Sequence, residues 1–188
     1  MLGQGSYKRA IQQEAGLRGN HTFGASGGGE TGPYFQSKRL TIYQEQLDRL
    51  ISQGRAYRAF ETTEELNAKR AEARAAKQPY RYDRAALQLS EDQINEHLAA
   101  GTPYVVRFKV PDESITVYDE VLGEVTTEAG LLDDFVIWKA DGYPTYHLAN
   151  VVDDHLMEIT HVIRAEEWIP STPKHVQLYA AFGWQPPC

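Results

Sequence analysis

The chain has 188 residues, of which 41% are hydrophobic and 24% are charged, an ordinary balance for a soluble globular protein. It contains no apolar run near the roughly 18 residues that a membrane-spanning helix needs, and no signal peptide is visible. We therefore expect no membrane partner. The formal net charge of −7 argues against a general nucleic-acid-binding protein.

The only cysteine is the last residue, Cys188. One cysteine excludes an intramolecular disulfide and a cysteine-based metal site. This composition fits a reducing, cytoplasmic location.

The N-terminal part of the chain is uneven in character. Residues 1–27 show no convincing periodicity, and the SGGG stretch at 26–29 is too flexible to hold a helix cheaply. From 37 to 53, apolar residues recur every three or four positions, which predicts a helix with one buried face. That face comprises Leu40, Tyr43, Leu47, Leu50 and Ile51. Gly54 is placed to end this helix as a left-handed cap.

Residues 56–137 mix helices and strands. Capping boxes at Thr62 to Glu65 and at Ser90 to Gln93 each predict the start of a helix. Strands are expected at 56–60, 104–110, 115–118, 125–127 and 135–139. In the second of these, alternation places Val106, Phe108 and Val110 on one face, opposite Arg107 and Lys109.

A basic run lies between Lys69 and Arg84, with six Lys or Arg residues and two acidic residues. We interpret this run as the solvated face of a helix. A local surface for nucleic acid is the alternative.

The stretch 141–184 is predicted as strand, short helical turn, strand, loop and helix, typical of α/β folds. Polar side chains follow its two predicted strands, which end near Ala149 and at Ile163. The first group is Tyr146, His147 and Asn150, and the second is Arg164, Glu166, Glu167 and Trp168. In an open α/β sheet, ligands bind beyond the carboxyl ends of the strands. Both groups are therefore candidate binding residues.

The chemistry of these side chains suits an amino acid. The Tyr146 hydroxyl and the Asn150 amide can serve both an ammonium and a carboxylate. Arg164 is costly to bury unpaired and pairs well with a carboxylate in bidentate geometry. The alternatives are half-buried strand positions for Tyr146 and His147, simple packing for Trp168, and a salt bridge from Arg164 to the acidic residues that follow it.

Asp153, Asp154 and His155 do not predict a metal site, because three consecutive side chains cannot easily converge on one ion. We interpret them as exposed carboxylates at a helix start. No nucleophilic Ser/His/Asp or Cys/His arrangement is found, so no catalytic residue is assigned.

The sequence Ser171-Thr172-Pro173 predicts a helix that begins with a hydroxyl cap and carries proline in its first turn. Its expected buried face is Val176, Tyr179 and Ala180. Gly183 is expected to end it.

Three segments carry a family resemblance in the same order along the chain: GPYFQSKRL at 32–40, AYRAFETTEEL at 56–66, and the long run from TYHLAN at 145 to AAFGW at 184. Together they resemble the catalytic region of bacterial glutamyl-tRNA synthetases of the zinc-free type, over roughly 28–187. The resemblance implies an α/β fold, namely part of a Rossmann-like class I catalytic domain with an inserted α+β connective domain.

The resemblance also implies a domain layout. Residues 28–55 would end the first catalytic half, 56–137 would form the insert that holds the tRNA acceptor stem, and 138–188 would form the second catalytic half. Residues 1–27 are unmatched and expected to be disordered or artefactual.

The activity implied by the resemblance is ATP-dependent activation of L-glutamate to glutamyl-adenylate, followed by transfer to the 3′ end of tRNA(Glu). Mg²⁺ would arrive with ATP, and the parent enzyme would be a monomer. Arg164 matches the family's glutamate-binding arginine, and Glu167 and Trp168 lie where ATP would bind. The glutamate-binding segment would be Tyr146, His147, Leu148, Ala149 and Asn150.

The chain departs from the family pattern at several places. Ala59 and Glu61 stand where some members carry a Cys-x-Cys pair, so no zinc is expected. RYDRAAL at 81–87 lacks the usual glycine, which leaves tRNA contacts there unassigned. HTFG at 21–24 does not match the H-x-G-H element that contacts ATP, and the chain ends before the K-M-S-K-S-like loop and the anticodon-binding domain. We therefore expect an incomplete enzyme that does not charge tRNA alone, with a frameshift, wrong start codon or truncation upstream of Gly28.

Two alternatives stay open. One is a glutamyl-queuosine tRNA(Asp) synthetase-like paralogue, which transfers glutamate to a modified anticodon base and usually carries zinc-binding cysteines. The other is a non-catalytic module that binds the tRNA acceptor end through the basic run at 69–84.

Overall fold

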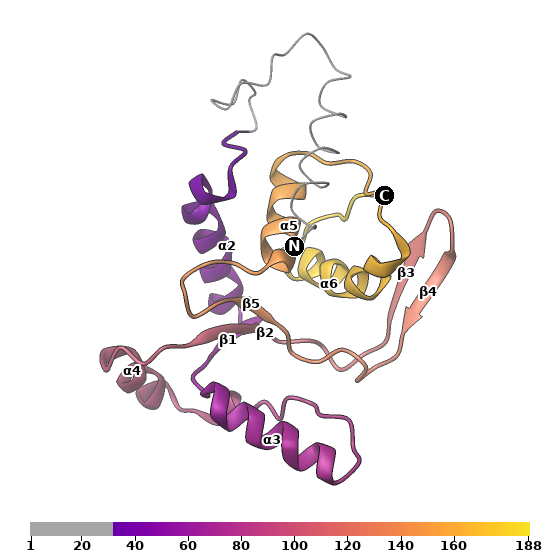
Figure 1. The fold of residues 1–188 in the computed structure, drawn as a ribbon. Helices are drawn as coiled ribbons and strands as arrows, with labels where there is room; N and C mark the ends of the chain where they lie inside the picture. Colours follow the sequence, from indigo (N-terminus) through magenta and orange to yellow (C-terminus); the bar gives the residue numbers. More distant parts are fainter. Residues whose placement is uncertain (1–31) are drawn as a thin grey trace. The chain divides into compact units, whose positions relative to one another are not determined.

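The computed structural model describes residues 32–188, so the expectations for residues 1–27 and for HTFG at 21–24 lie outside the described residues. The chain divides into two compact units, residues 1–39 and 40–188. The described end of the first unit is a single 3-10 turn, η2 (Gln36–Lys38). All other described helices and strands belong to the second unit (Figure 1).

Helix α2 (Leu40–Ser52) confirms the helix predicted over 37–53, with a later start. Three of its apolar positions are buried, as their spacing predicted. They are Tyr43, Leu47 and Leu50. Gly54 has a φ of +67°, and the Arg55 N–H donates back to the Leu50 carbonyl oxygen at 2.9 Å. This geometry confirms the left-handed cap.

Three short strands form an antiparallel sheet in the order β1-β2-β5. They are β1 (Ala56–Ala59), β2 (Val105–Phe108) and β5 (Val136–Trp138). Each lies within a predicted strand and is shorter than predicted. Ala56 pairs with Phe108, and Val106 pairs with Trp138. The predicted boundary between residues 137 and 138 therefore falls inside β5.

Both faces of β2 are covered. Val106 and Phe108 are buried in the core, which confirms the predicted alternation. Arg107 points to the opposite face, yet it is only 8% exposed. Its guanidinium lies over the Tyr82 ring at 3.8 Å, and its Nη1 donates to the Asp134 carbonyl oxygen at 2.7 Å. The segment before η3 (Ala85–Gln88) thus shields the second face of the sheet.

The insert carries two capped helices, α3 (Thr63–Ala75) and α4 (Glu91–Ala99). Thr62 and Ser90 form complete capping boxes at their starts, so both predicted helix starts are confirmed. Among residues 32–188, no helix is long and apolar enough to cross a membrane.

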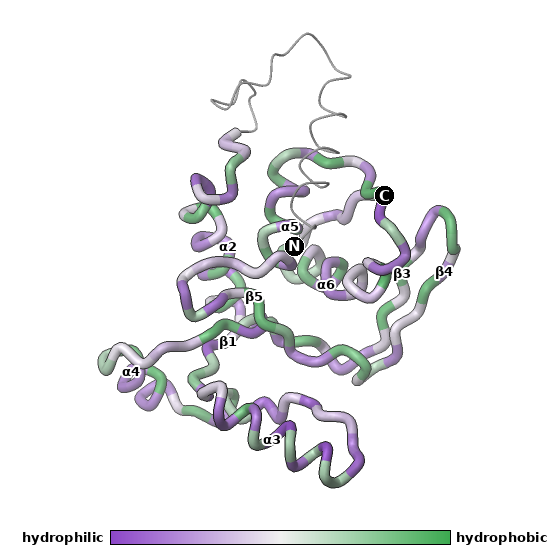
Figure 2. The backbone as a smooth tube through the Cα atoms, in the orientation of Figure 1, coloured by the Kyte–Doolittle hydropathy of each residue, from purple (hydrophilic) through white to green (hydrophobic). Residues whose placement is uncertain are grey.

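A hairpin of β3 (Ile115–Asp119) and β4 (Gly123–Thr127) extends from the insert. The residues at its tip are apolar, as Figure 2 shows by their colour, and Val121 is 91% exposed. The hairpin pairs only with itself, so its two strands stay outside the three-stranded sheet.

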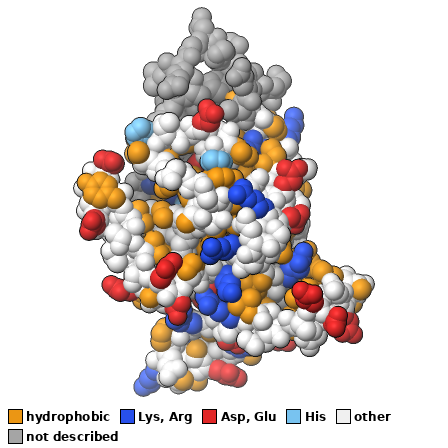
Figure 3. All heavy atoms as spheres, turned by 180° about the vertical axis from the view of Figure 1, so that it is seen from behind, with side chains coloured by type: hydrophobic (Ala, Val, Ile, Leu, Met, Phe, Trp, Pro, Cys, Tyr) orange, Lys and Arg blue, Asp and Glu red, His pale blue; other side chains and the backbone are white. Residues whose placement is uncertain are grey.

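The basic residues between Lys69 and Arg84 lie in two environments. Helix α3 has no buried residue, so its basic side chains form the solvated face that the sequence predicted. Lys69 pairs with Asp83 at 2.7 Å on the surface, whereas Arg84 pairs with the buried Asp134 at 2.8 Å. On the face shown in Figure 3, Lys and Arg side chains gather near the middle of the view, with Asp and Glu mostly around them.

The first strand predicted in 141–184 is wrong: this segment is helix α5 (Tyr146–Leu156). The physical reason is its periodicity. Tyr146, Asn150 and Asp154 recur every four residues, while Leu148, Val151 and Val152 form an apolar face on the other side and are fully buried. The Thr145 hydroxyl donates to the Val136 carbonyl oxygen at 3.0 Å and ties the helix start to β5.

The second predicted strand, over 159–163, is also wrong, because this segment has no regular structure. Instead it pairs with the chain end. The Cys188 N–H donates to the Thr160 carbonyl oxygen at 2.9 Å, and the Val162 N–H donates to the Cys188 carbonyl oxygen at 2.7 Å. Ile163 is 90% exposed, so its apolar character does not mark a core position.

The last helix, α6 (Thr172–Phe182), follows directly after the 3-10 turn η4 (Glu166–Ser171). Pro173 lies in its first turn and Gly183 ends it with a φ of +70°, as predicted. Ser171 makes no side-chain cap hydrogen bond, so the predicted hydroxyl cap is wrong. Its backbone is already in the right-handed helical region because η4 runs into α6 without a break.

The predicted buried face of α6 is only partly right. Tyr179 is buried, whereas Val176 is partly exposed and Ala180 is exposed. His175 and Gln177 are buried in their place.

One hydrophobic core joins α2, the sheet, α5 and α6. Its fully buried members include Tyr43, Leu50, Val106, Ile137, Leu148, Val151 and Leu178. In Figure 1 these three helices lie on the same side of the sheet. Because α5 and α6 pack against each other, their polar residues are brought together from distant positions in the chain.

Candidate functional site

Arg164 is at the centre of the polar cluster beside α5 and α6. Its Nη2 donates to the Asn150 Oδ1 at 2.7 Å, and its Nη1 contacts the His175 Nδ1 at 2.8 Å. Its Nη2 also lies 3.9 Å from the Asp154 carboxylate. The Arg164 side chain is 18% exposed. Its ionic partner is therefore a buried residue of α5, not Glu166 or Glu167 as the alternative had it.

Asn150 and Asp154 support this arginine from one face of α5. They are one helical turn apart, and the Asn150 Nδ2 donates to the Asp154 Oδ2 at 2.8 Å. Both residues are 4% exposed. The amide is thereby fixed, with its oxygen toward Arg164 and its nitrogen toward the carboxylate. The buried charge of the guanidinium is balanced by that carboxylate.

Two histidines extend the cluster. The His147 Nδ1 lies 3.0 Å from the His175 Nε2, and the Phe135 ring lies 5.4 Å from the His147 ring. Burial lowers the pKa of His147 to about 4 and that of His175 to about 2, with nearby Arg164 and Lys174 lowering both further. Both imidazoles are therefore neutral near pH 7.

Aromatic side chains form the solvent-facing edge of the cluster. The rings of Tyr146 and Trp168 are 5.2 Å apart and are 38% and 36% exposed. The Tyr146 ring also lies 5.7 Å from the His175 ring. Burial of its inner part raises the pKa of Tyr146, so its hydroxyl stays protonated and can donate a hydrogen bond.

The remaining predicted site residues are dispersed. Leu148 and Ala149 are in the hydrophobic core, so their side chains point away from Arg164. Glu167 is exposed in η4, next to Trp168.

Asp153, Asp154 and His155 diverge toward three different partners. Asp153 accepts from the Tyr43 hydroxyl, Asp154 accepts from Asn150, and His155 stacks on Trp184 at 3.8 Å. Their interpretation as exposed carboxylates at a helix start is wrong, because they lie in the last turns of α5 and Asp154 is buried. Within residues 32–188 there is no group of three or more His, Cys, Asp or Glu residues that could hold a metal ion.

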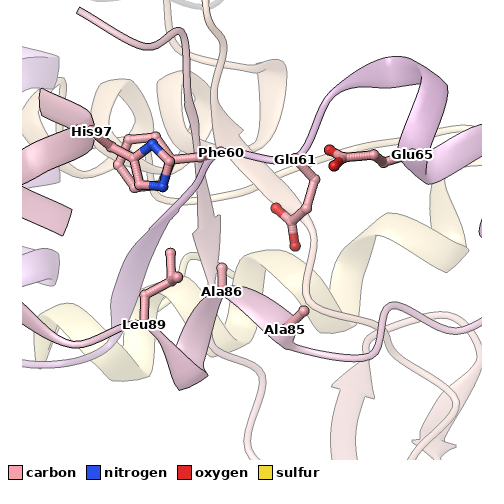
Figure 4. A pocket seen from close by; sticks show the side chains of 7 residues that line it. All are labelled: Phe60, Glu61, Glu65, Ala85, Ala86, Leu89 and His97. Atoms are coloured by element: carbon pink, nitrogen blue, oxygen red, sulfur yellow. The ribbon is translucent and has the colours of Figure 1, made fainter. Parts of the chain in front are cut away.

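A small cavity of about 210 Å³ lies in the insert (Figure 4). Its lining includes Phe60, whose ring stacks on His97 at 4.6 Å, and Glu61. The Glu61 carboxylate accepts a hydrogen bond from the Tyr82 hydroxyl. Glu61 therefore links β1 to the segment that covers the sheet.

Sequence reasoning missed two members of the cluster. Asp154 could have been found, because its spacing of four from Asn150 places both on one face once the segment is read as a helix. His175 could not, since no local pattern joins it to His147, 28 residues earlier, or to Arg164, 11 residues earlier.

The family model for the catalytic domain of class I tRNA synthetases (E and Q) matches residues 16–188. The chain belongs to this family. The match begins ahead of residue 28, where the resemblance was judged to start. The α/β fold of a class I synthetase catalytic domain, predicted from the motifs, is thereby confirmed.

Curated relatives of this synthetase family agree. The glutamate–tRNA ligase of Fusobacterium nucleatum subsp. nucleatum is 52% identical over 169 residues, which cover 89% of this chain and 33% of the relative. That of Acinetobacter baylyi is 50% identical over 169 residues, which cover 89% and 34%. The chain thus spans about one third of the length of the curated relatives it matches.

Solved structures of synthetases show the same fold. The glutamate tRNA ligase from Elizabethkingia meningosepticum, in complex with its amino acid, superposes with a TM-score of 0.84 at 39% identity. The superposition covers 100% of this chain and 38% of that chain. The glutamate–tRNA synthetase from Elizabethkingia anophelis gives 0.83 at 39% identity.

Proposed function

We propose that this chain supplies the glutamate-binding part of a glutamate–tRNA ligase. The observation that carries the proposal is Arg164, whose guanidinium is held by acceptors on two different helices, Asn150 on α5 and His175 on α6. A planar guanidinium fixed in this way suits a carboxylate, because two parallel N–H groups can meet its two oxygens. The curated relatives named glutamate–tRNA ligase support glutamate as the source of that carboxylate.

The reaction has two steps. A carboxylate oxygen of L-glutamate attacks the α-phosphorus of ATP, the bond from that phosphorus to the bridging oxygen breaks, and pyrophosphate leaves. A hydroxyl of the terminal ribose of tRNA(Glu) then attacks the acyl carbon, loses its proton, and displaces AMP. Neither step needs an enzyme nucleophile, so the protein contributes position and charge stabilisation.

The residue roles follow from the positions in the cluster. Arg164 binds a glutamate carboxylate, Asn150 and His147 support its surroundings, and Tyr146 closes the pocket from the solvent side. Glu167 and Trp168 in η4 are proposed to lie beside ATP. The N-terminus of α6 would face the adenylate phosphate, which a helix N-terminus stabilises.

Mg²⁺ is proposed to arrive with ATP, held by phosphates and water. This agrees with the described part of the chain, which groups no three metal-ligating side chains. The ion would add positive charge beside the phosphates.

The insert is proposed to hold the tRNA acceptor end. Exposed basic side chains on α3 support this role, with Arg70 as an example, because phosphate contacts need solvent-facing cations. A monomeric enzyme acting in the cytoplasm is part of the same proposal. Neither alternative, the queuosine paralogue nor the non-catalytic module, is favoured by a specific feature of the site.

We also propose that the insert folds without zinc. Ala59 is buried and offers no ligand atom, and Glu61 is engaged by the Tyr82 hydroxyl. Purified protein should contain no stoichiometric zinc by plasma mass spectrometry, and EDTA should leave its thermal midpoint unchanged. Stoichiometric zinc with a fall in the midpoint after chelation would contradict this.

The glutamate proposal is tested by titrating the 188-residue chain with L-glutamate in a calorimeter, with D-glutamate and L-glutamine as competing ligands. We expect saturable binding of L-glutamate and about 10- to 100-fold weaker binding by Arg164→Ala, since charge-assisted hydrogen bonds contribute about 1.5–3 kcal/mol. Arg70→Ala, which removes an exposed arginine of α3, is the matched control and should bind like wild type. Equal loss in both variants, or binding that does not depend on Arg164, would sink the proposal.

A further inference from the structure

The hydrogen bonds around Arg164 have a fixed direction. A guanidinium has only N–H donors, so the His175 Nδ1 at 2.8 Å must be an acceptor. The proton of a neutral His175 is then on Nε2, where it donates to the His147 Nδ1 at 3.0 Å. His147 in turn carries its proton on Nε2. One contact with Arg164 therefore sets the tautomer of both histidines.

The surroundings keep His175 in this form. It is 4% exposed on α6. The charged groups that face it are Arg164 and Lys174, and both disfavour a positive imidazole. A protonated His175 would lose the acceptor that holds the guanidinium and would place a second positive charge beside it.

The geometry leaves the useful part of the guanidinium unoccupied by these bonds. Each Nη carries two N–H groups, and Asn150 and His175 take one from each. The Nε is buried and has no hydrogen-bond partner among residues 32–188. The second N–H groups of the two Nη atoms are thus the pair that can meet both oxygens of one carboxylate.

We propose that His175 is a positioning residue for substrate recognition: as a neutral Nδ1 acceptor on α6, it sets the plane of the Arg164 guanidinium and so aims its end-on pair of donors at the substrate carboxylate. The inference rests on the proposed function and deepens it. It assigns a role to a side chain that does not touch the substrate. It also explains why a buried helix position carries a histidine where an apolar residue would pack at lower desolvation cost.

Two substitutions separate the acceptor role from plain packing. In His175→Asn, the amide oxygen stands close to the position of Nδ1 and can still accept from Arg164. In His175→Gln, the polar end reaches the position of Nε2 and can still meet His147, but the acceptor near Arg164 is gone. Gln keeps more of the side-chain volume, so a structural role predicts that it is the better tolerated of the two.

The experiment combines L-glutamate titration with two-bond ¹H–¹⁵N correlation spectra of the histidine rings in the 188-residue chain. We expect His175 as the Nε2–H tautomer in wild type, affinity within about 3-fold of wild type for His175→Asn, and at least about 10-fold weaker binding for His175→Gln. A Nδ1–H tautomer, or Gln binding as well as or better than Asn, overturns the positioning role.

The two levels of the proposal fail separately. If wild type binds no L-glutamate while the Nε2–H tautomer is seen, the proposed function fails and the Arg164–His175 contact stands without a substrate role, which also overturns the inference. If wild type binds L-glutamate but the Asn and Gln variants bind alike, only the inference fails. Circular dichroism of each variant confirms that it is folded before it is compared.

Discussion

The Tyr43 hydroxyl on α2 donates to both carboxylate oxygens of Asp153 on α5, at 2.9 and 2.8 Å. Tyr43 is fully buried, so its ring belongs to the core while its hydroxyl ties two helices together. This bond holds α5 against α2 a few residues after Asn150, on the helix that supports Arg164.

Removing this hydroxyl tests the tie. Tyr43→Phe keeps the ring and should lower the free energy of unfolding by about 1–2 kcal/mol, because a partly buried carboxylate loses a donor. Tyr118→Phe on β3, where the side chain is 71% exposed, is the matched control and should change it by less than about 0.5 kcal/mol. Urea unfolding measures both, and equal effects in the two variants would contradict the tie.

Asp134 is expected to be the most sensitive carboxylate of the insert. It is 1% exposed and accepts from the Tyr57 hydroxyl, the Arg84 guanidinium at 2.8 Å and the Val110 N–H at 2.9 Å. Asp134→Ala leaves these donors unmatched and should cost about 3–5 kcal/mol of stability.

Asp141 provides the control for that substitution. It pairs with Lys139 at 2.8 Å on the surface, so Asp141→Ala should cost less than about 1 kcal/mol. A cost for Asp134→Ala no larger than this would show that the buried carboxylate does not organise the segment.

The candidate glutamate-binding segment should separate into core and site positions. Leu148 is fully buried, so Leu148→Ala should lower the stability by about 2–5 kcal/mol. Tyr146 is 38% exposed, so Tyr146→Phe should change stability by less than about 1 kcal/mol and instead weaken L-glutamate binding. Unfolding and binding measured on the same two variants check this. A stable Leu148→Ala protein with impaired binding would reverse the assignment.

Stability should fall in mild acid because of the two buried histidines. The pKa of His147 is about 4 in the folded protein against an ordinary 6.5, so between these pH values the unfolded chain binds the extra proton and the folded one does not. The free energy of unfolding is then fully present above pH 6.5 and is lost as the pH falls toward 4, by about 1.4 kcal/mol per pH unit for each such histidine.

Unfolding titrations between pH 7 and pH 5 measure this slope. His147→Asn keeps an acceptor for His175 but cannot be protonated, so its slope should be smaller by the share of one histidine. An unchanged slope would mean that His147 is not the group being titrated. The partly exposed His161, replaced by Asn, is the control and should leave the slope nearly as in wild type.

Local patterns were enough to predict much of this chain. The helix over 40–52 and its Gly54 cap, both capping boxes of the insert and the three sheet strands follow from spacing and capping that act over a few residues. The long motifs were enough to identify the family. They also contained Arg164, whose charge at the end of an apolar segment marks a binding residue without any structure.

Other features depend on how distant segments pack. Apolar residues at 148, 151 and 152 suit a strand or a helix, and the core formed with α2 and α6 selects the helix. The apolar run at 159–163 reads as a strand, but the sheet ends at β5 and the run pairs with the chain end instead. The neutral His175 acceptor has no local signal at all. A hydrogen bond between α6 and Arg164 exists only because burial of their apolar faces brings α5 and α6 together, and that contact decides which atoms of Arg164 can meet a carboxylate.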